Sequence, residues 1–138
     1  MPSFSNFADF ENYLNQKINK SVESACKRIL DELQTIIVEE YYDQYSPKQY
    51  VREYLFLQSA TTKMLNQITG MVFMDEDVMN YPGDWDGIHQ LTYASDGYHG
   101  RLSIQTDGRF WDTFVEFMKN NALLILKEEM KKQGIPLK

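Results

Sequence analysis

The chain contains 138 residues, of which 43% are hydrophobic and 25% are charged, close to the averages of globular proteins. This composition excludes a disordered tail, a collagen-like fibre and a disulfide-framework toxin, and the single cysteine, Cys26, cannot form an intramolecular disulfide. The net charge of −6 disfavours a protein that binds nucleic acid by neutralising phosphates.

The N-terminus has neither the basic start nor the apolar segment of a secretory signal. No apolar run approaches the ~20 residues that are needed to cross a bilayer. We therefore expect one domain over residues 1–138, with no membrane among its partners.

The first expected element is a long helix over residues 6–44, which contains no Gly or Pro from residue 7 onward. Asn6 is its expected N-cap, with Asp9 in the first turn, and Ser46-Pro47 is its expected stop. A helix from Phe7 to Tyr42 would be about 50 Å long, more than a domain of this size covers on both sides. Its apolar stripe therefore predicts a long partner helix or a neighbouring subunit. The stripe consists of Phe10, Leu14, Ile18, Val22, Ala25, Ile29, Leu33 and Ile36.

The middle of the chain, residues 50–105, is expected to be rich in β-structure. Val51–Leu57 contains β-branched and aromatic residues and is predicted to be a strand. Met64–Met74 is predicted to be a second strand, in which Gly70 marks a bulge or a close approach of the backbone. Residues 75–87, with their acids, Pro82 and two glycines, are predicted to be a loop.

Shorter elements complete this middle part. Residues 88–93 fit either a short strand or a helical turn, and the pattern does not decide between them. Gly97 and Gly100 predict another turn, and Arg101–Gln105 predicts a short edge strand.

A second helix is expected over residues 107–133. Asp107 is its expected N-cap, Gly134 takes the C′ position and Pro136 provides the stop. The predicted fold class is therefore α+β: a long N-terminal helix, a small central antiparallel sheet and a C-terminal amphipathic helix packed on the sheet.

His89 and His99 lie ten residues apart, with Asp96 between them and Asp84 and Asp86 just before. A metal site needs three or four converging ligands, and this spacing matches no metal-binding motif, so surface or hydrogen-bonded histidines are favoured. We therefore expect no metal and no cofactor.

A calcium-binding loop starting at Asp75 is also disfavoured. Compared with the EF-hand pattern, it has Met79 at position 5, Asn80 where the turn glycine belongs, and Asp86 in place of the bidentate glutamate. A solvated or interface loop is the favoured interpretation.

Nucleophilic catalysis has no support in the sequence. Cys26 lies on the apolar side of the long helix beside Lys27 and Arg28, but no base is positioned near it. There is no GxSxG, P-loop or GxGxxG motif. We therefore expect a protein without enzymatic activity.

Residues 41–54 contain five tyrosines around a proline, with Lys48 and Arg52 interleaved. Tyrosine and arginine are enriched at the centres of protein–protein contacts. An RNA-stacking surface is disfavoured by the acidic chain, and a competing interpretation is that several of the tyrosines cover the sheet. The candidate interface residues are Tyr41, Tyr42, Tyr45, Pro47, Tyr50 and Arg52.

This chain resembles the phage and prophage HK97 gp10-like tail-completion, neck or minor capsid proteins. The resemblance lies in Tyr45, Pro47, Tyr50 and Arg52 after a long helix, and in the segment Gly97–Gly100. It extends to a closing helix that begins near FWDTFVEFM and ends in KKQGIP. It covers most of the chain in architecture but only about a dozen positions in detail, and Leu55–Ser59 departs from the more glycine-rich turn of many relatives.

The resemblance implies a structural, non-enzymatic virion protein: a component of a ring that joins head and tail. The implied partners are copies of itself and other head–tail connector or tail proteins, with DNA as a passing, non-specific neighbour. The implied location is the neck or tail region of the virion, which is assembled in the cytoplasm of the bacterial host. Acidic side chains facing the lumen would repel DNA phosphates and let the genome pass. The candidate lumen-facing residues are Asp75, Glu76, Asp77, Asp84 and Asp86.

Two other functions remain open. The chain could be a small bacterial interaction module that dimerises through the long helix. A metal-dependent hydrolase that uses His89, His99 and the neighbouring acids is the third hypothesis.

Overall fold

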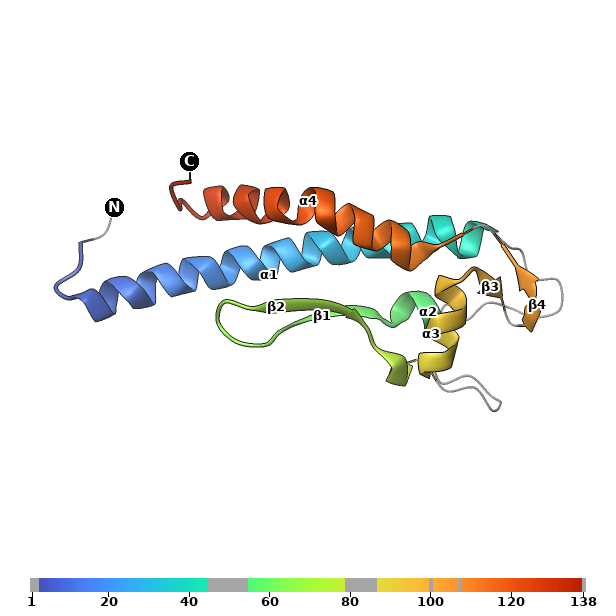
Figure 1. Ribbon diagram of the computed structural model, residues 1–138. Helices are drawn as coiled ribbons and strands as arrows, with labels where there is room; N and C mark the ends of the chain where they lie inside the picture. Colours follow the sequence, from blue (N-terminus) through green and yellow to red (C-terminus); the bar gives the residue numbers. More distant parts are fainter. Residues whose placement is uncertain (1–2, 45–54, 79–86, 100, 107, 138) are drawn as a thin grey trace.

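The structure is a computed structural model that describes residues 3–44, 55–78, 87–99, 101–106 and 108–137 (Figure 1). It is a mixed α+β fold, mostly helical, as the sequence predicts. The elements in chain order are α1 (Phe7–Glu40), the 3₁₀ turn η1 (Tyr42–Gln44), α2 (Leu55–Gln58), β1 (Ala60–Met64), β2 (Gly70–Met74), η2 (Glu76–Val78), α3 (Gly87–Ser95), β3 (Tyr98–His99), β4 (Arg101–Gln105) and α4 (Phe110–Lys132).

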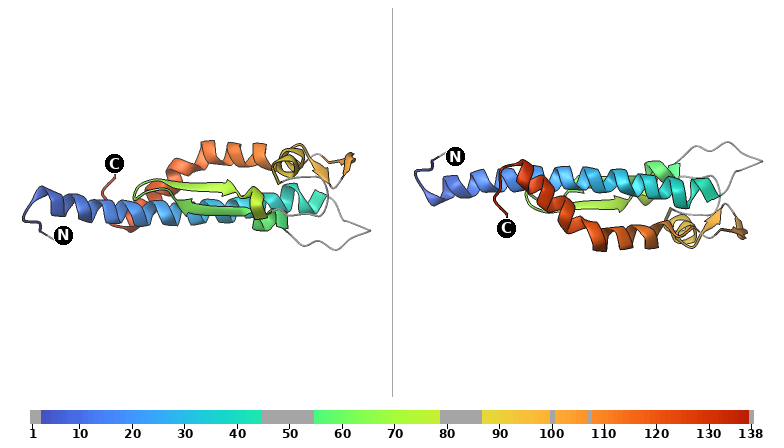
Figure 2. Two further views of the ribbon diagram at one scale, coloured as in Figure 1. Left: turned by 90° about the horizontal axis from the view of Figure 1, so that it is seen from below. Right: turned by 90° about the horizontal axis from the view of Figure 1, so that it is seen from above.

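α1 is the central rod of the molecule. α4 runs antiparallel along one side of it, and the β1–β2 hairpin lies along another side (Figure 1). The views from above and below show that α4 crosses α1 at an angle (Figure 2). The principal packing partner of α4 is therefore α1, and α2, α3 and the β3–β4 pair gather at one end of the rod.

The start of α1 is capped as predicted. The Asn6 side chain accepts a hydrogen bond of 2.8 Å from the backbone N–H of Asp9, which satisfies one of the first unpaired donors of the helix. The helix ends at Glu40, earlier than the predicted residue 44, and η1 continues the chain. Ser46-Pro47 therefore does not end α1 directly, and it lies outside the described residues.

The predicted strands need correction. Leu55–Leu57, predicted to end a strand, belongs to α2, and residues 51–54 lie outside the described part. The predicted strand Met64–Met74 is confirmed only at its end, as β2. Its start is the last residue of β1, and the two strands form a hairpin in which Ala60 pairs with Met74 and Met64 pairs with Gly70. The turn over residues 65–69 reverses the chain and is closed by a hydrogen bond of 2.8 Å from the backbone N–H of Leu65 to the Thr69 carbonyl.

Gly70 makes the close approach that its position in the sequence predicts. A Cβ atom at this position would lie 2.5 Å from the Cys26 sulfur and 3.0 Å from Val22 Cγ1. Only glycine therefore lets β2 lie this close to α1. Cys26 is buried beneath it.

The ambiguous residues 88–93 form part of the helix α3. The predicted edge strand Arg101–Gln105 is confirmed as β4, which pairs antiparallel with β3. The turn predicted at Gly97 is confirmed by its φ of +88°, whereas Gly100 lies outside the described residues.

α4 begins three residues later than predicted. Its N-cap is Arg109, and Asp107 lies outside the described residues. The reason is that the backbone before α4 packs closely against the end of α1. Gly108 is buried there, and a Cβ at this position would overlap the carbonyl oxygen of Glu40. The backbone N–H of Arg109 also donates to the Glu40 side chain at 3.2 Å. At the other end, Gly134 has a φ of +80° at the predicted C′ position.

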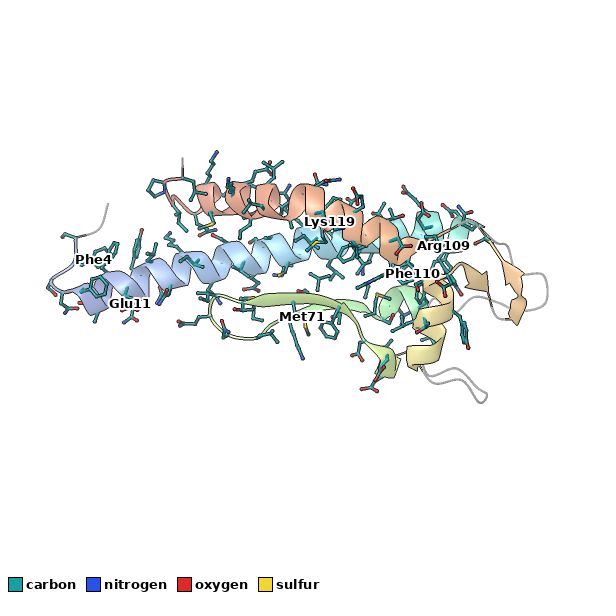
Figure 3. The ribbon with its side chains drawn as sticks, in the orientation of Figure 1. Phe4, Glu11, Met71, Arg109, Phe110 and Lys119 are labelled. Carbon is teal, nitrogen blue, oxygen red and sulfur yellow. The ribbon has the colours of Figure 1, made fainter. Side chains whose placement is uncertain are left out.

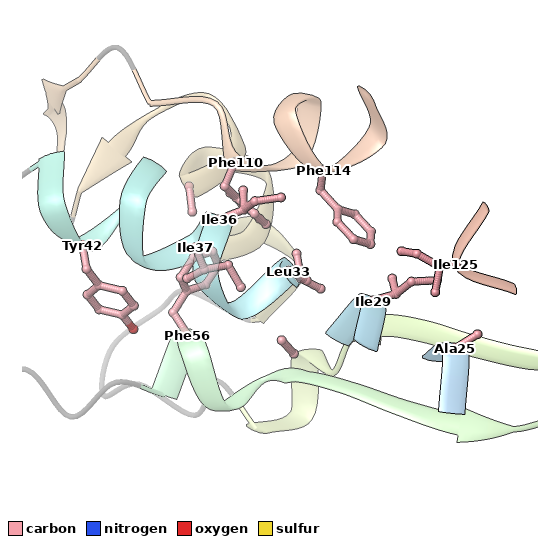
Figure 4. Packing of buried hydrophobic residues seen from close by; sticks show 12 residues of the cluster. Ala25, Ile29, Leu33, Ile36, Ile37, Tyr42, Phe56, Phe110, Phe114 and Ile125 are labelled. Carbon is pink, nitrogen blue, oxygen red and sulfur yellow. The ribbon is translucent and has the colours of Figure 1, made fainter. Parts of the chain in front are cut away.

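The hydrophobic core lies over the second half of α1 (Figure 4). Phe56 of α2 and Phe110 of α4 meet edge-to-face with ring centroids 4.9 Å apart, and both are almost fully buried. The α1 stripe supplies Ala25, Ile29, Leu33, Ile36 and Ile37 to this core.

Candidate functional site

The described tyrosines of the candidate interface pack within the monomer. Tyr42 is buried, and its hydroxyl accepts a hydrogen bond of 3.1 Å from the backbone N–H of Leu57. Tyr41 is half-buried, with its ring centroid 4.5 Å from that of Phe56. Tyr42 is therefore a core residue, and its prediction as an interface residue is corrected. Tyr45, Pro47, Tyr50 and Arg52 lie outside the described residues.

The acidic segment begins on η2. Glu76 and Asp77 are exposed, whereas Asp75 is half-buried and accepts a hydrogen bond of 3.0 Å from the backbone N–H of Asp77. Asp84 and Asp86 lie outside the described residues. Two of the three described acids are thus exposed to solvent, and their role in facing a lumen stays a prediction.

The histidines lie on two different elements, His89 on α3 and His99 on β3, and their side chains lie outside the described part. Among the side chains that the structure does describe, no three His, Cys, Asp or Glu residues are grouped as metal ligands.

An ion-pair network that joins α1 to α4 was missed by the sequence analysis. Arg28 Nη1 lies 2.9 Å from Glu128 Oε2 and 3.0 Å from Glu129 Oε1, and Lys132 Nζ lies 2.9 Å from the same Glu129 oxygen. Hydrogen bonds from Lys132 and then Arg28 lower the pKa of the buried Glu129 carboxyl, against an opposing effect of burial. The network fixes the position of α4 along α1.

The Glu129→Gln variant is expected to be less stable than the wild type at pH 7, by about 1–2 kcal/mol, because the cationic donors Arg28 and Lys132 then meet a neutral acceptor and both ion pairs are lost. Since the pKa of Glu129 is lowered by folding, its contribution is present above the unfolded pKa of 4.5 and is lost as pH falls through the folded pKa. The stability difference between the two proteins should therefore shrink below pH 4.5. Urea unfolding at pH 7 and pH 3 measures it, and a constant difference would contradict the assignment.

The first turns of α1 extend past the ends of α4 and of the hairpin (Figures 1 and 3). Asn19, which donates to the Gln67 carbonyl at 2.8 Å, marks where the hairpin ends along the rod. Beyond this point an aromatic tip, defined as Phe4, Phe7, Phe10 and Tyr13, packs mainly on itself. Phe7 is 76% exposed and the other three are half-buried, so this small aromatic cluster stands outside the core.

A groove of about 600 Å³ runs along the solvent side of the second half of α1. Carboxylates on its wall give it a negative charge, and Val38 and Leu57 give it apolar patches. We call it the acidic groove. It is lined by Asp31, Gln34, Thr35, Val38, Glu39, Asp43 and Leu57.

No described helix is both long and apolar enough to cross a membrane. A sequence model of the family called YomN matches residues 6–133, which is most of the chain. No curated protein and no solved structure matches the chain.

Proposed function

The chain belongs to the YomN family, which is associated with Bacillus phages and prophages, and from this premise we propose that it is a structural protein of the virion. In this proposal it is a component of the neck or tail-completion ring, of the HK97 gp10-like kind. The ring joins head to tail and lets DNA pass. The protein takes its place as the particle is assembled in the bacterial cytoplasm.

The observation that carries the proposal is the uncovered end of α1. A monomer that functions alone gains nothing from a rod that extends beyond its core and ends in an aromatic cluster whose Phe7 is exposed. Aromatic side chains are strong anchors of protein–protein contacts because they bury a large area at a low cost in conformational entropy. A ring of copies, or a neighbouring connector protein, would cover this end.

The charge distribution supports the proposed passage of DNA. From Asp31 to Asp43 the chain contains five acids and no base. The exposed Glu76 and Asp77 lie on η2, which contacts α2 and α3 at the same end of the rod. A surface of this kind repels phosphates, so DNA would slide past it without binding. This role requires structure and charge but no catalysis.

Deleting the gene is expected to give DNA-filled heads and tails that fail to join, and the wild-type gene supplied in trans should restore complete particles. Electron microscopy of induced lysates counts joined and unjoined particles. Averaged images of wild-type particles should show density for this chain at the head–tail junction.

Normal particles from the deletion strain, or the absence of this chain from purified particles, would contradict the proposed role. A stable dimer in solution combined with that absence would instead favour the alternative of a small bacterial interaction module.

A further inference from the structure

The outer face of α4 is apolar and basic, and it packs against no other described part of the chain. Leu123 and Leu124 are 65% and 56% exposed. Lys119, Lys127 and Lys131 are also exposed, and none of them forms an ion pair with a described acid. We call these five residues the basic ridge.

The ridge follows the geometry of helix surfaces. Lys119, Leu123, Lys127 and Lys131 are each four residues apart, so they form one continuous row along α4. Rows of this spacing are the ridges that pack into the grooves of a neighbouring helix. Leu124 lies beside this row.

The acidic groove carries a row with the same spacing. Asp31, Thr35 and Glu39 lie four residues apart on α1, and Asp43 follows four residues later on η1, just beyond the end of α1. All four are exposed, and no described cation forms an ion pair with the three acids. Val38, which is 36% exposed, lies beside the row. The groove therefore presents unneutralised charge next to apolar surface.

The two rows match position by position when two copies of the chain lie with these helices parallel. The first, third and fourth positions are lysines on the ridge and acids on the groove. The second position is uncharged on both, with Leu123 opposite Thr35. The opposite direction would place Leu123 against Glu39 and would leave Lys127 against Thr35.

We propose that the basic ridge of one copy docks into the acidic groove of a second copy. Burial of Leu123 and Leu124 against Val38 supplies attraction, and the three charge pairs select the partner and the direction. α1 and α4 run antiparallel within one chain, so this contact turns the second copy end over end relative to the first. Two copies related in this way pair ridge with groove twice in a closed two-fold dimer, or they extend as a filament of alternating copies. This inference goes beyond the proposed function, since it names a contact between two copies of the chain that does not require the ring.

Charge reversal on either surface tests the contact. The ridge variant Lys127→Glu/Lys131→Glu and the groove variant Glu39→Lys/Asp43→Lys should each self-associate at least about tenfold more weakly than the wild type in low salt. An equal mixture of the two should associate again, since the acidic ridge of one fits the basic groove of the other. Sedimentation velocity over a range of concentrations measures the association.

A matched control separates the contact from net charge. Lys20→Glu/Lys63→Glu changes the net charge as much as the ridge variant does, at exposed lysines away from both surfaces. It should associate like the wild type, and circular dichroism should show that every variant is folded. Wild-type association should weaken as salt is raised.

The inference is overturned if the wild type stays monomeric, if the ridge variant associates normally, or if the mixture fails to recover. A chain found at the head–tail junction whose ridge variant is incorporated normally would overturn only this inference. A chain absent from particles whose purified form passes the mixing test would overturn only the proposed function.

Discussion

The Gly108→Ala variant is expected to lose about 3 kcal/mol of unfolding free energy, or to fail to fold. The new methyl group would overlap the carbonyl oxygen of Glu40 and press against the Gln44 side chain. A backbone atom at the end of a helix cannot move aside as a side-chain terminus does, so α1 and the start of α4 would have to separate. Urea unfolding followed by circular dichroism measures the loss.

Gly134→Ala is the matched control for this change. Gly134 has a φ of +80°, but a Cβ there would meet no atom within 4 Å. Its substitution should cost only the strain of the left-handed conformation, about 1–2 kcal/mol. Equal losses in the two variants would show that steric overlap at residue 108 is not the cause.

The Phe110→Ala variant is expected to lose about 3–5 kcal/mol, the usual cost of removing a buried phenylalanine. Its ring is only 2% exposed and makes the edge-to-face contact with Phe56 that joins α4 to α2. The loss leaves a cavity at the end of the core where α1, α2 and α4 meet. Thermal and urea unfolding both measure it.

Phe7→Ala is the matched control for this change. It also removes a phenylalanine side chain, but at the N-terminal end of α1, away from the core. Because Phe7 is 76% exposed, its loss should change stability by less than about 0.5 kcal/mol. A large loss from Phe7→Ala would show that the aromatic tip stabilises the monomer, and it would remove the argument that the tip awaits a partner.

The two long helices could be predicted because they carry sustained periodic stripes and local caps. Asn6 and Gly134 act through neighbouring backbone atoms, so their roles can be read from a few residues. Val51–Leu57 was less informative, since a short apolar and aromatic run fits a strand or a buried helical turn equally well. The late start of α4 depends on the contact between Gly108 and Glu40, which no local pattern reveals.

The candidate site was harder to predict for a related reason. A tyrosine suits an interface or a core, and the choice at Tyr42 depends on the backbone N–H of Leu57 that its hydroxyl meets. The rows on α1 and α4 are visible in the sequence as residues four apart. Which of those faces is covered by the chain itself, however, follows only from the three-dimensional packing.

The pairing of α1 with α4 has a consequence for how the chain reaches its native state. Arg28 meets Glu128, 100 positions later in the chain, and the core needs both helices at once. During translation the α1 stripe therefore leaves the ribosome long before its cover exists. The stripe is therefore open to aggregation until α4 emerges. The chain can complete its fold only after the last third of the polypeptide has been synthesised.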